Sequence, residues 1–326
     1  KFIKMKRRGF LIKSLKGSFI VSLPLPLSSF NITRNNKLKI GIVADVHQDI
    51  IHDGLSRLSF FINAMKKRKP NFIIQLGDFS LPRKQNQPFI DLWNSFYGSN
   101  YHVLGNHDMR DFGYTKKETM DWWGMQNRYY SFDYENFHFI VLDGNDENPK
   151  PWNGYVRYIG SEQKKWLIND LKNNSKPCIL FSHQSLEAPG GIANGDEIRN
   201  ILENSTIKPG QSKVIACLSG HHHTDYVKTI NGIPYIQINS MSYKWVGDKF
   251  KYIRFTPQIE QAFPSISKTC PYKDPLYTIL TLDEKSGELH IEGRKTSFIP
   301  PTPNELNIPN AATMSPTISE RNLKFD

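Results

Sequence analysis

Short apolar runs of strand length recur through the first two-thirds of the chain, and each ends in a polar cluster. Five of these runs are predicted to form buried strands: 38–44, 72–76, 101–104, 178–182 and 214–219. Apolar residues at helical spacing over 55–65 and 89–97 separate the first three runs. Strands and helices alternating in this order predict parallel strands joined by crossover helices, and therefore an α/β fold.

The first two predicted helices have recognisable ends and faces. Asp53 is the expected N-cap of the first helix, and Pro70 ends it. In the second helix, which is expected over 89–97, Ile90, Trp93 and Tyr97 share one face. Two further helices are predicted over 161–171 and 196–202.

Later apolar runs come in pairs around short polar turns, which is typical of β-hairpins. The predicted pairs are 129–132 with 138–142, 226–230 with 233–238, and 276–282 with 288–292. Asn231-Gly232 in the second pair is the strongest two-residue turn signal. His138 therefore falls inside a predicted strand and is expected to be a strand residue, not a metal ligand.

Each of two aromatic segments is compatible with two structural roles. Residues 110–128 could form a lid or a packed loop, and packing is favoured; residues 241–274 could shape a substrate pocket or pack against the body. Residues 37–298 are predicted to form one domain. The proline-rich segment 299–326 lacks periodicity and is expected to be an extended surface tail or disordered.

The charge of the chain is concentrated at its beginning. Seven of the 42 basic residues and none of the 31 acidic residues lie in residues 1–30, so most of the net charge of +11 belongs there. Nucleic acid is therefore not expected as a partner of the body. No apolar run reaches the ~18 residues of a membrane-spanning helix, so no transmembrane segment is expected.

Residues 1–30 are predicted to be an export signal. Arg7-Arg8 followed by Gly9-Phe10-Leu11 resembles a twin-arginine motif, and the mildly apolar stretch 17–27 comes after it. We therefore expect the protein in the bacterial periplasm or outside the cell. A disordered basic arm is the alternative, in which case a cytoplasmic location is expected.

Side chains that bind metals follow each of the five buried runs. The clusters are Asp45-Val46-His47, Gly77-Asp78, Gly105-Asn106-His107-Asp108, His183 and Gly220-His221-His222-His223. Taken singly, such residues are more often turn residues, helix caps or surface histidines. Five in series at strand ends, where ligands gather in open α/β sheets, predict one shared site.

The chemistry of this site follows from its donor atoms. Carboxylate oxygen, amide oxygen and imidazole nitrogen are present without thiolate, which suits Mn, Fe or Zn more than Ca. The set exceeds what one ion usually takes, so two transition-metal ions are predicted.

The motifs and their order resemble those of the calcineurin-like metallophosphoesterases over about residues 37–225. The resemblance implies a four-layer α/β/β/α sandwich of two mixed sheets with outer helices. It also implies that Asp78 bridges the two ions. The remaining ligands would be Asp45, His47 and His223 at one ion, and Asn106, His183 and His221 at the other.

The same resemblance implies an enzyme that hydrolyses small phosphate monoesters or diesters. A metal-bridged hydroxide would attack phosphorus, and His107 would assist the leaving group. Asp108 would hold the imidazole of His107 in one tautomer. Purple acid phosphatases carry a tyrosine where Leu81 stands and lack the histidine found at His47. The chain is therefore more similar to the cyclic-nucleotide and glycerophosphodiester phosphodiesterases.

The alternative function is a non-catalytic binding scaffold on the same fold. Such a scaffold can shed the histidine at position 107, which this chain retains. The oligomeric state does not follow from the sequence.

Overall fold

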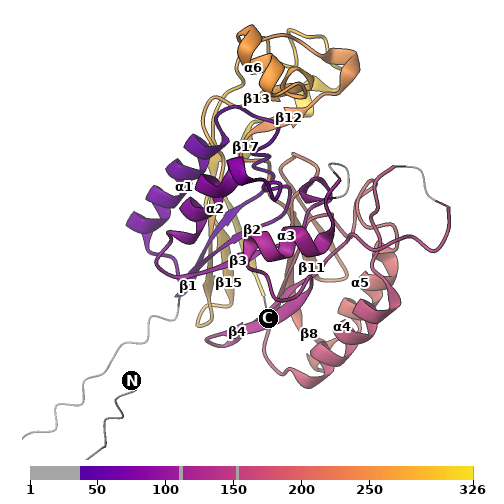
Figure 1. Ribbon diagram of the computed structural model, residues 1–326. Coiled ribbons are helices and arrows are strands. Elements are labelled where there is room, and N and C mark those ends of the chain that lie inside the picture. Colours follow the sequence, from indigo (N-terminus) through magenta and orange to yellow (C-terminus); the bar gives the residue numbers. More distant parts are fainter. Residues whose placement is uncertain (1–36, 110–112, 152–153, 326) are drawn as a thin grey trace, which may run out of the picture. The chain divides into compact units, whose positions relative to one another are not determined.

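Two mixed sheets of six strands each form the centre of the structure (Figure 1). The computed structural model describes residues 37–109, 113–151 and 154–325. The first sheet is, in order of pairing, β18 (Arg321–Lys324), β15 (Glu288–Ile291), β14 (Thr278–Asp283), β1 (Lys37–Val43), β2 (Phe72–Gln75) and β3 (Ser99–His102). The second is β10 (Tyr226–Ile230), β11 (Ile233–Gln237), β9 (Val214–Ser219), β6 (Cys178–Ser182), β5 (Phe137–Val141) and β4 (Tyr130–Tyr134). The predicted export signal lies outside the described residues.

Each sheet has a parallel part beside antiparallel strands. β1, β2 and β3 run parallel in the first sheet, and β5, β6, β9 and β11 run parallel in the second. The facing surfaces of the two sheets bury one apolar cluster, to which Ile40 and Phe72 contribute from one sheet and Phe139 and Phe181 from the other. The parallel strands that carry the site motifs are therefore fixed from both sides.

Helices cover the outer faces of both sheets. α1 (Gly54–Arg68) and α2 (Gln87–Asn94) pack on the first sheet, and α3 (Lys116–Trp123) adds Trp123 to the same cluster. α4 (Ser161–Asn173) and α5 (Gly195–Glu203) pack on the second sheet, on the opposite side of the sandwich (Figure 1). The order of layers is thus α/β/β/α, which confirms the expected fold.

Short elements complete the described structure. Three two-stranded sheets pair β7 (Thr206–Lys208) with β8 (Gln211–Ser212), β12 (Tyr243–Trp245) with β13 (Thr269–Pro271), and β16 (Arg294–Lys295) with β17 (Thr317–Ile318). The chain between β12 and β13 carries α6 (Pro257–Ala262), and the three lie together at the top of Figure 1. The 3-10 helices are η1 (Lys84–Asn86), η2 (Asn106–Asp108), η4 (Asp248–Phe250), η5 (Ile266–Lys268) and η6 (Ala311–Thr313).

The three predicted hairpins are confirmed, but each of the first two helices differs from expectation in one detail. Asp53 is the N-cap residue of α1, as predicted, but its side chain makes no cap hydrogen bond, because its carboxylate accepts one from the guanidinium of Arg57 at 2.8 Å instead. Tyr97 lies beyond the end of α2 and is 61% exposed, so it does not share the buried face of Ile90 and Trp93. The spacing of the apolar residues predicted a helix that continues past Asn94, where α2 ends.

Two segments are more ordered than their composition indicates. α3 lies inside the aromatic segment 110–128; Thr115 caps its N-terminus and Gly124 ends it in the left-handed conformation. The last strand, β18, pairs antiparallel with β15, so the expectation of a tail is wrong there. Four residues are too few to show strand periodicity, and tertiary pairing supplies the order. None of the described helices is long and apolar enough to cross a membrane.

Candidate metal centre

The seven predicted metal ligands follow the carboxyl ends of parallel strands from both sheets. Asp45 and His47 come after β1, Asp78 after β2, Asn106 after β3, His183 after β6, and His221 and His223 after β9. Because these strand ends meet at one place, residues that are distant in the chain become neighbours, such as His47 and His223, which are 176 positions apart.

Six of these residues form two groups with the geometry of metal ligands. In the first, Asp45, His47 and His223 each offer an atom within 4.8 Å of the others. Nε2 of His47 lies 3.2 Å from Nε2 of His223, which lies 3.3 Å from Oδ1 of Asp45. Two imidazole nitrogens that face each other this closely need a shared proton or a cation between them.

The second group consists of Asp78, His183 and His221, again with ligand atoms within 4.8 Å of one another. Nε2 of His183 lies 3.1 Å from Oδ2 of Asp78, and Nδ1 of His221 lies 3.2 Å from Nε2 of His183. The same Oδ2 of Asp78 lies 3.5 Å from Nε2 of His47 in the first group. Asp78 therefore connects the two groups, as a bridging carboxylate would.

Asn106 is the seventh predicted ligand, and its amide fits a bound cation. Both Oδ1 and Nδ2 of Asn106 are buried without a hydrogen-bond partner among the described residues. Leaving a buried polar group unsatisfied costs about 1–3 kcal/mol. A metal ion bound by the amide oxygen would offset that cost, which agrees with the mixed oxygen and nitrogen donor set of the two groups.

The backbone at the site is held in an uncommon conformation. Ten described residues other than glycine have positive φ, and five of them are predicted ligands. Their φ angles are 51° at Asp45, 52° at His47, 52° at Asp78, 75° at His221 and 48° at His223. Left-handed backbone costs non-glycine residues about 1–3 kcal/mol each and gathers at functional sites.

Two motif glycines are required because the site is crowded. A Cβ on Gly77 would lie 2.5 Å from Nδ1 of His183, and φ at Gly77 is +92°. A Cβ on Gly105 would lie 2.2 Å from the backbone nitrogen of Asp78. These close approaches explain why glycine precedes the aspartate and the asparagine in the two motifs.

Hydrogen bonds on the outer side of the histidines fix their orientation. Nδ1 of His183 contacts the carbonyl oxygen of Leu76 at 2.8 Å, and Nδ1 of His223 contacts that of Tyr243 at 2.8 Å. A carbonyl only accepts, so each Nδ1 carries a hydrogen and each Nε2 faces the group, where it can bind a cation once it is deprotonated.

Tyr155 is a site residue that sequence reasoning missed. Its hydroxyl lies 2.7 Å from Nε2 of His221. Tyr155 belongs to an irregular segment between β5 and α4, where neither periodicity nor a motif marks it. No signal in the sequence could have found it, because the contact spans 66 positions of the chain.

Burial and the close carboxylates shift the histidines in opposite directions. Burial lowers the pKa of His47 to about 3. Burial also opposes the charged form of His183, but the carboxylate of Asp78 outweighs it and raises the pKa of His183 to about 9. Metal ligands must be deprotonated, so binding of a cation here would displace a proton from His183.

His107 lies beside the first group, whereas Asp108 has contacts other than those predicted. The ring of His107 is 5.5 Å from that of His47, and its backbone N–H donates to Oδ1 of Asp78 at 2.8 Å. The carboxylate of Asp108 accepts from the backbone N–H groups of Gly105, Asp78 and Phe79 at 2.6–2.9 Å. Asp108 thus holds the backbone of the Asp78 turn. Its expected task of orienting the imidazole of His107 stays a prediction.

A cavity of about 340 Å³ opens over the two groups and includes His107 and Tyr155 in its lining. β12 contributes Tyr243, Lys244 and Trp245, so part of the segment 241–274 does shape a pocket. The ammonium group of Lys244 donates to the carbonyl oxygens of His222 and His223, and burial lowers its pKa to about 8. The cavity therefore places an amine beside the predicted ligands.

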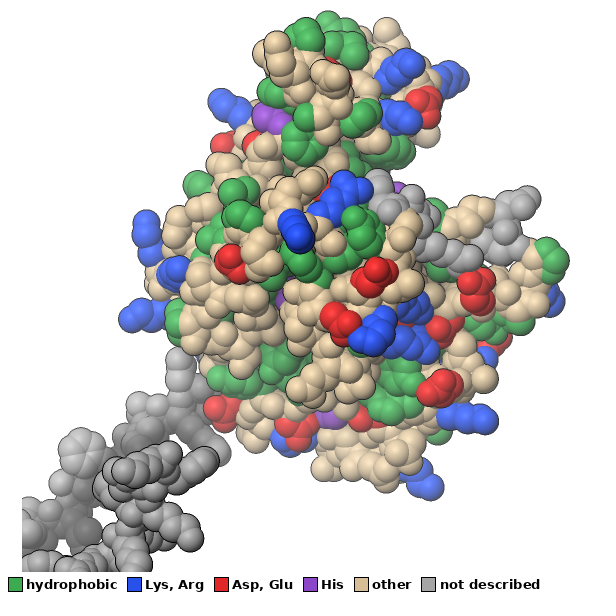
Figure 2. All heavy atoms as spheres, in the orientation of Figure 1, with side chains coloured by type: hydrophobic (Ala, Val, Ile, Leu, Met, Phe, Trp, Pro, Cys, Tyr) green, Lys and Arg blue, Asp and Glu red, His purple; other side chains and the backbone are tan. Residues whose placement is uncertain are grey.

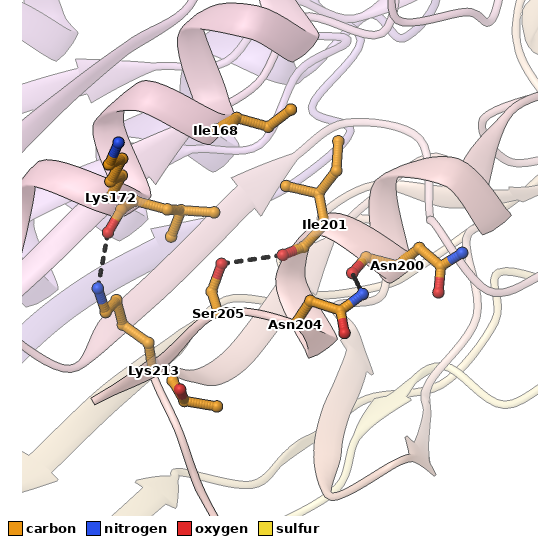
Figure 3. A pocket seen from close by; sticks show the side chains of 9 residues that line it. Ile168, Lys172, Asn200, Ile201, Asn204, Ser205 and Lys213 are labelled. Atoms are coloured by element: carbon orange, nitrogen blue, oxygen red, sulfur yellow. Dashed lines mark hydrogen bonds between the residues drawn. The ribbon is translucent and has the colours of Figure 1, made fainter. Parts of the chain in front are cut away.

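Other cavities differ in how they relate to the ligands. One of about 340 Å³ is lined by residues that include Asn106 and Tyr155 and so adjoins the site. A larger one of about 580 Å³ lies between α4 and α5 and contains none of the predicted ligands (Figure 3). There, Lys213 and Ser205 hydrogen-bond to main-chain carbonyls, so their polar groups already have partners.

Comparisons with known proteins agree with this geometry. The sequence model of a family described as calcineurin-like phosphoesterase matches residues 38–225, more than half of the chain. A comparison with curated proteins finds no match.

Two solved structures are similar in fold. A dimetal phosphatase from Danio rerio has a TM-score of 0.60 and 14% sequence identity, covering 89% of this chain and 99% of that one. GAP50, described as the anchor in the inner membrane complex of Plasmodium, has a TM-score of 0.51 and 14% identity, covering 89% of both chains. At such low identity these likenesses show the fold alone.

Proposed function

Because the chain belongs to the calcineurin-like phosphoesterase family, we propose that it hydrolyses phosphate esters with two divalent transition-metal ions. The observation that carries the proposal is the pair of ligand groups connected by Asp78. Mn, Fe and Zn are the ions that its oxygen and nitrogen donors suit.

The residues of the two groups have separate tasks in this proposal. Asp45, His47 and His223 hold one ion, and Asn106, His183 and His221 hold the other, with Asp78 shared between them. Two bound ions supply Lewis acidity and a water of lowered pKa as the nucleophile. The left-handed turns keep the ligand atoms in place before any ion arrives, which reduces the reorganisation that binding requires.

Two residues outside the ligand set act on the substrate. His107 lines the cavity over the ligands, and we assign it the transfer of a proton to the leaving-group oxygen. Lys244 lines the same cavity and attracts the negative charge of a phosphate ester. Asp108 supports this arrangement indirectly through the backbone of Asp78.

A small soluble ester is the proposed substrate. On the face shown in Figure 2, basic and acidic side chains of the described residues are interspersed and do not form a continuous basic surface of the kind that binds nucleic acid. Whether the ester is a monoester or a diester, as in the phosphodiesterase subgroup, is a question for a substrate panel. Export through the segment 1–30 likewise stays a prediction.

The second candidate is a non-catalytic scaffold on the same fold. The likeness to GAP50, an anchor in the inner membrane complex of Plasmodium, supports it at the level of the fold. The retained ligand set and His107 favour chemistry, since a scaffold has no use for a left-handed turn at five ligand positions.

The experiment that tests the proposal measures hydrolysis by the purified full chain. With manganese present, it should hydrolyse at least one of bis(p-nitrophenyl) phosphate, p-nitrophenyl phosphate and cyclic AMP. Chelation and Asp78→Ala should each abolish that activity. The control is Asp121→Ala, because the side chain of Asp121 is exposed and pairs with Lys117 on the same helix. Activity that survives in Asp78→Ala after removal of metal would contradict the proposal.

A further inference from the structure

We infer that Tyr155 is a positioning residue for the second ligand group. Its hydroxyl holds the imidazole of His221 in the tautomer that presents Nδ1 to Asp78 and His183. The inference rests on the proposed binuclear function, and it assigns a task to a residue that belongs to none of the motifs.

The two ring nitrogens of His221 have different surroundings. Nε2 meets the hydroxyl of Tyr155 at 2.7 Å, whereas Nδ1 lies 3.2 Å from Nε2 of His183 within the ligand group. A neutral imidazole carries its hydrogen on only one nitrogen. If Nε2 donates to Tyr155, the lone pair lies on Nδ1, where an ion of the second group needs it.

The outer ring nitrogen of His221 hydrogen-bonds to a side chain, whereas those of two other ligand histidines hydrogen-bond to the main chain. The outer nitrogens of His183 and His223 contact backbone carbonyls, which only accept hydrogen bonds. A hydroxyl both donates and accepts, so it fixes a tautomer only if its own hydrogen is directed elsewhere. The carbonyl oxygen of Gly190 lies 3.5 Å from the hydroxyl of Tyr155 and is an acceptor to which that hydrogen can be directed.

The backbone of His221 is already fixed, which leaves its ring as the adjustable part. Its N–H donates to both carboxylate oxygens of Asp45, at 3.0 and 2.9 Å, and its φ of 75° is left-handed. The ring of Tyr155 stands nearly edge-on to that of His221, with centroids 5.3 Å apart and an interplanar angle of 72°. Tyr155 therefore determines the ring orientation and the tautomer and does not determine the backbone.

The segment that carries Tyr155 is itself held in place. The backbone N–H of Ala193 donates to the carbonyl of Arg157 at 2.6 Å. The side chain of Asn194 accepts from the N–H of Ile159 at 3.1 Å and donates to its carbonyl at 2.9 Å. These bonds tie residues 157–159 to the loop that contains Gly190, so the hydroxyl of Tyr155 is positioned before any ion binds.

Loss of a group that orients a metal-bound histidine typically lowers metal affinity by ~10–100-fold. Tyr155→Phe keeps the ring and removes only the hydroxyl. We expect it to weaken the binding of one ion and to leave the other unchanged, because the hydroxyl contacts His221, which belongs to the second group. The matched control is Tyr158→Phe, since Tyr158 is half-buried in the same segment and does not hydrogen-bond to a ligand histidine.

The test titrates Zn²⁺ into the metal-free full chain and measures both binding steps by calorimetry and by metal content. In Tyr155→Phe, one step should weaken at least ~10-fold, while Tyr158→Phe binds like the wild type. Nitrogen-15 spectra of the metal-free imidazoles give a second readout. His221 should carry its hydrogen on Nε2 in the wild type and populate both tautomers in Tyr155→Phe.

Excess metal should restore hydrolysis in Tyr155→Phe, which a ligand variant such as Asp78→Ala should not show. Two unchanged binding steps in Tyr155→Phe would overturn the inference, and so would an equal weakening of both steps, which would mean that Tyr155 supports the fold. A wild type that takes up fewer than two ions would contradict this inference together with the proposed function. Two ions in the wild type with an unaffected Tyr155→Phe would contradict the inference alone.

Discussion

The structure contains two clusters of histidine and aspartate. They are similar in composition and differ in whether their polar atoms all have partners. One is the candidate metal centre. The other, here called the His138 cluster, consists of His138, Asp133, Asp170, Ser131 and Lys176 around β4, β5 and α4. Both are built from strand residues and their neighbours.

In the His138 cluster every charged or polar group meets a partner of the opposite kind. Nδ1 of His138 pairs with Asp133 at 2.7 Å, and Nε2 pairs with Asp170 at 2.8 Å. The second oxygens of the two carboxylates accept from Lys176 and Ser131. The cluster needs no further ligand, and its strands have ordinary extended backbone.

In the metal centre, imidazole nitrogens of two histidines face one another instead. The Nε2 atoms of His47 and His223 are 3.2 Å apart, and the amide of Asn106 lacks a partner among the described residues. The backbone is left-handed at five of the predicted ligands. The difference teaches that histidine and aspartate in proximity do not by themselves indicate a metal site. Unpaired ligand atoms that converge on one point, on backbone held in a left-handed conformation, are the stronger indication.

The largest effect is expected from removing one of the two imidazoles that face each other, that of His47. His47→Asn should lower hydrolysis by more than ~100-fold, the upper range for losing a residue that only supports a ligand. Asparagine tolerates left-handed backbone, and His47 is neutral at pH 7 because burial lowers its pKa to about 3. The melting temperature of the metal-free protein should therefore change little. Rates, metal content and melting in chelator measure this; two bound ions with full activity would contradict it.

Metal removal should separate the two clusters by stability. A bound ligand adds about 2.7 kcal/mol to the unfolding free energy at a free concentration of 100 times its Kd. At ~2–4 °C per kcal/mol, chelation should lower the melting temperature by several degrees. Calorimetric scans with and without chelator should show this decrease in the wild type and equally in His138→Leu. An unchanged melting temperature of the wild type in chelator would contradict the prediction that this site binds metal ions.

Removing the centre of the other cluster should affect stability alone. His138→Leu leaves the carboxylate of Asp170, whose side chain is only 15% exposed, facing an apolar group. Losing the partner of a buried polar group costs about 1–3 kcal/mol, measured here by urea unfolding. The double variant His138→Leu with Asp170→Leu should recover part of this loss. Hydrolysis by the folded variants should stay unchanged, and a loss of metal would show that the two clusters are coupled.

The convergence of the ligands could be predicted from the sequence because topology determines it. Parallel strands place their carboxyl ends at one edge of a sheet, so a residue such as Asp78 or His183 that follows a buried run is placed by that run. The same logic assigned His138 to the interior of a strand, where β5 confirms it.

Contacts set by the tertiary path of irregular segments could not be predicted. Tyr155 reaches His221 from a segment without periodicity, and Asp108 turns toward the backbone of the Asp78 turn although His107 is its neighbour in sequence. β18 gains its order from pairing with β15, which four residues cannot show by themselves. Local patterns specify elements, whereas these hydrogen bonds depend on where distant chain segments pass.

The smallest expected effect, a difference in pH dependence, is the sharpest way to tell the clusters apart. Burial opposes the charged form of His138, but its bonds to Asp170 and Asp133 raise its pKa above the ordinary 6.5. The stability that this pairing contributes is therefore complete below about 6.5 and is lost as pH rises through the folded-state pKa. Urea unfolding of the metal-free wild type and His138→Gln between about pH 6 and pH 9 should show their difference in unfolding free energy shrinking toward high pH.

The metal centre should respond to pH with the opposite sign. Its histidines must lose protons to bind an ion, and Asp78 raises the pKa of His183 to about 9 despite burial, so the stabilisation by added metal should grow as pH rises. Both slopes of stability against pH should be measured on the same protein, one with chelator and one with Zn²⁺. Opposite signs distinguish a cluster stabilised by a bound proton from one stabilised by bound cations. Two slopes of the same sign would mean that the centre, like the His138 cluster, is a proton-bound structural network.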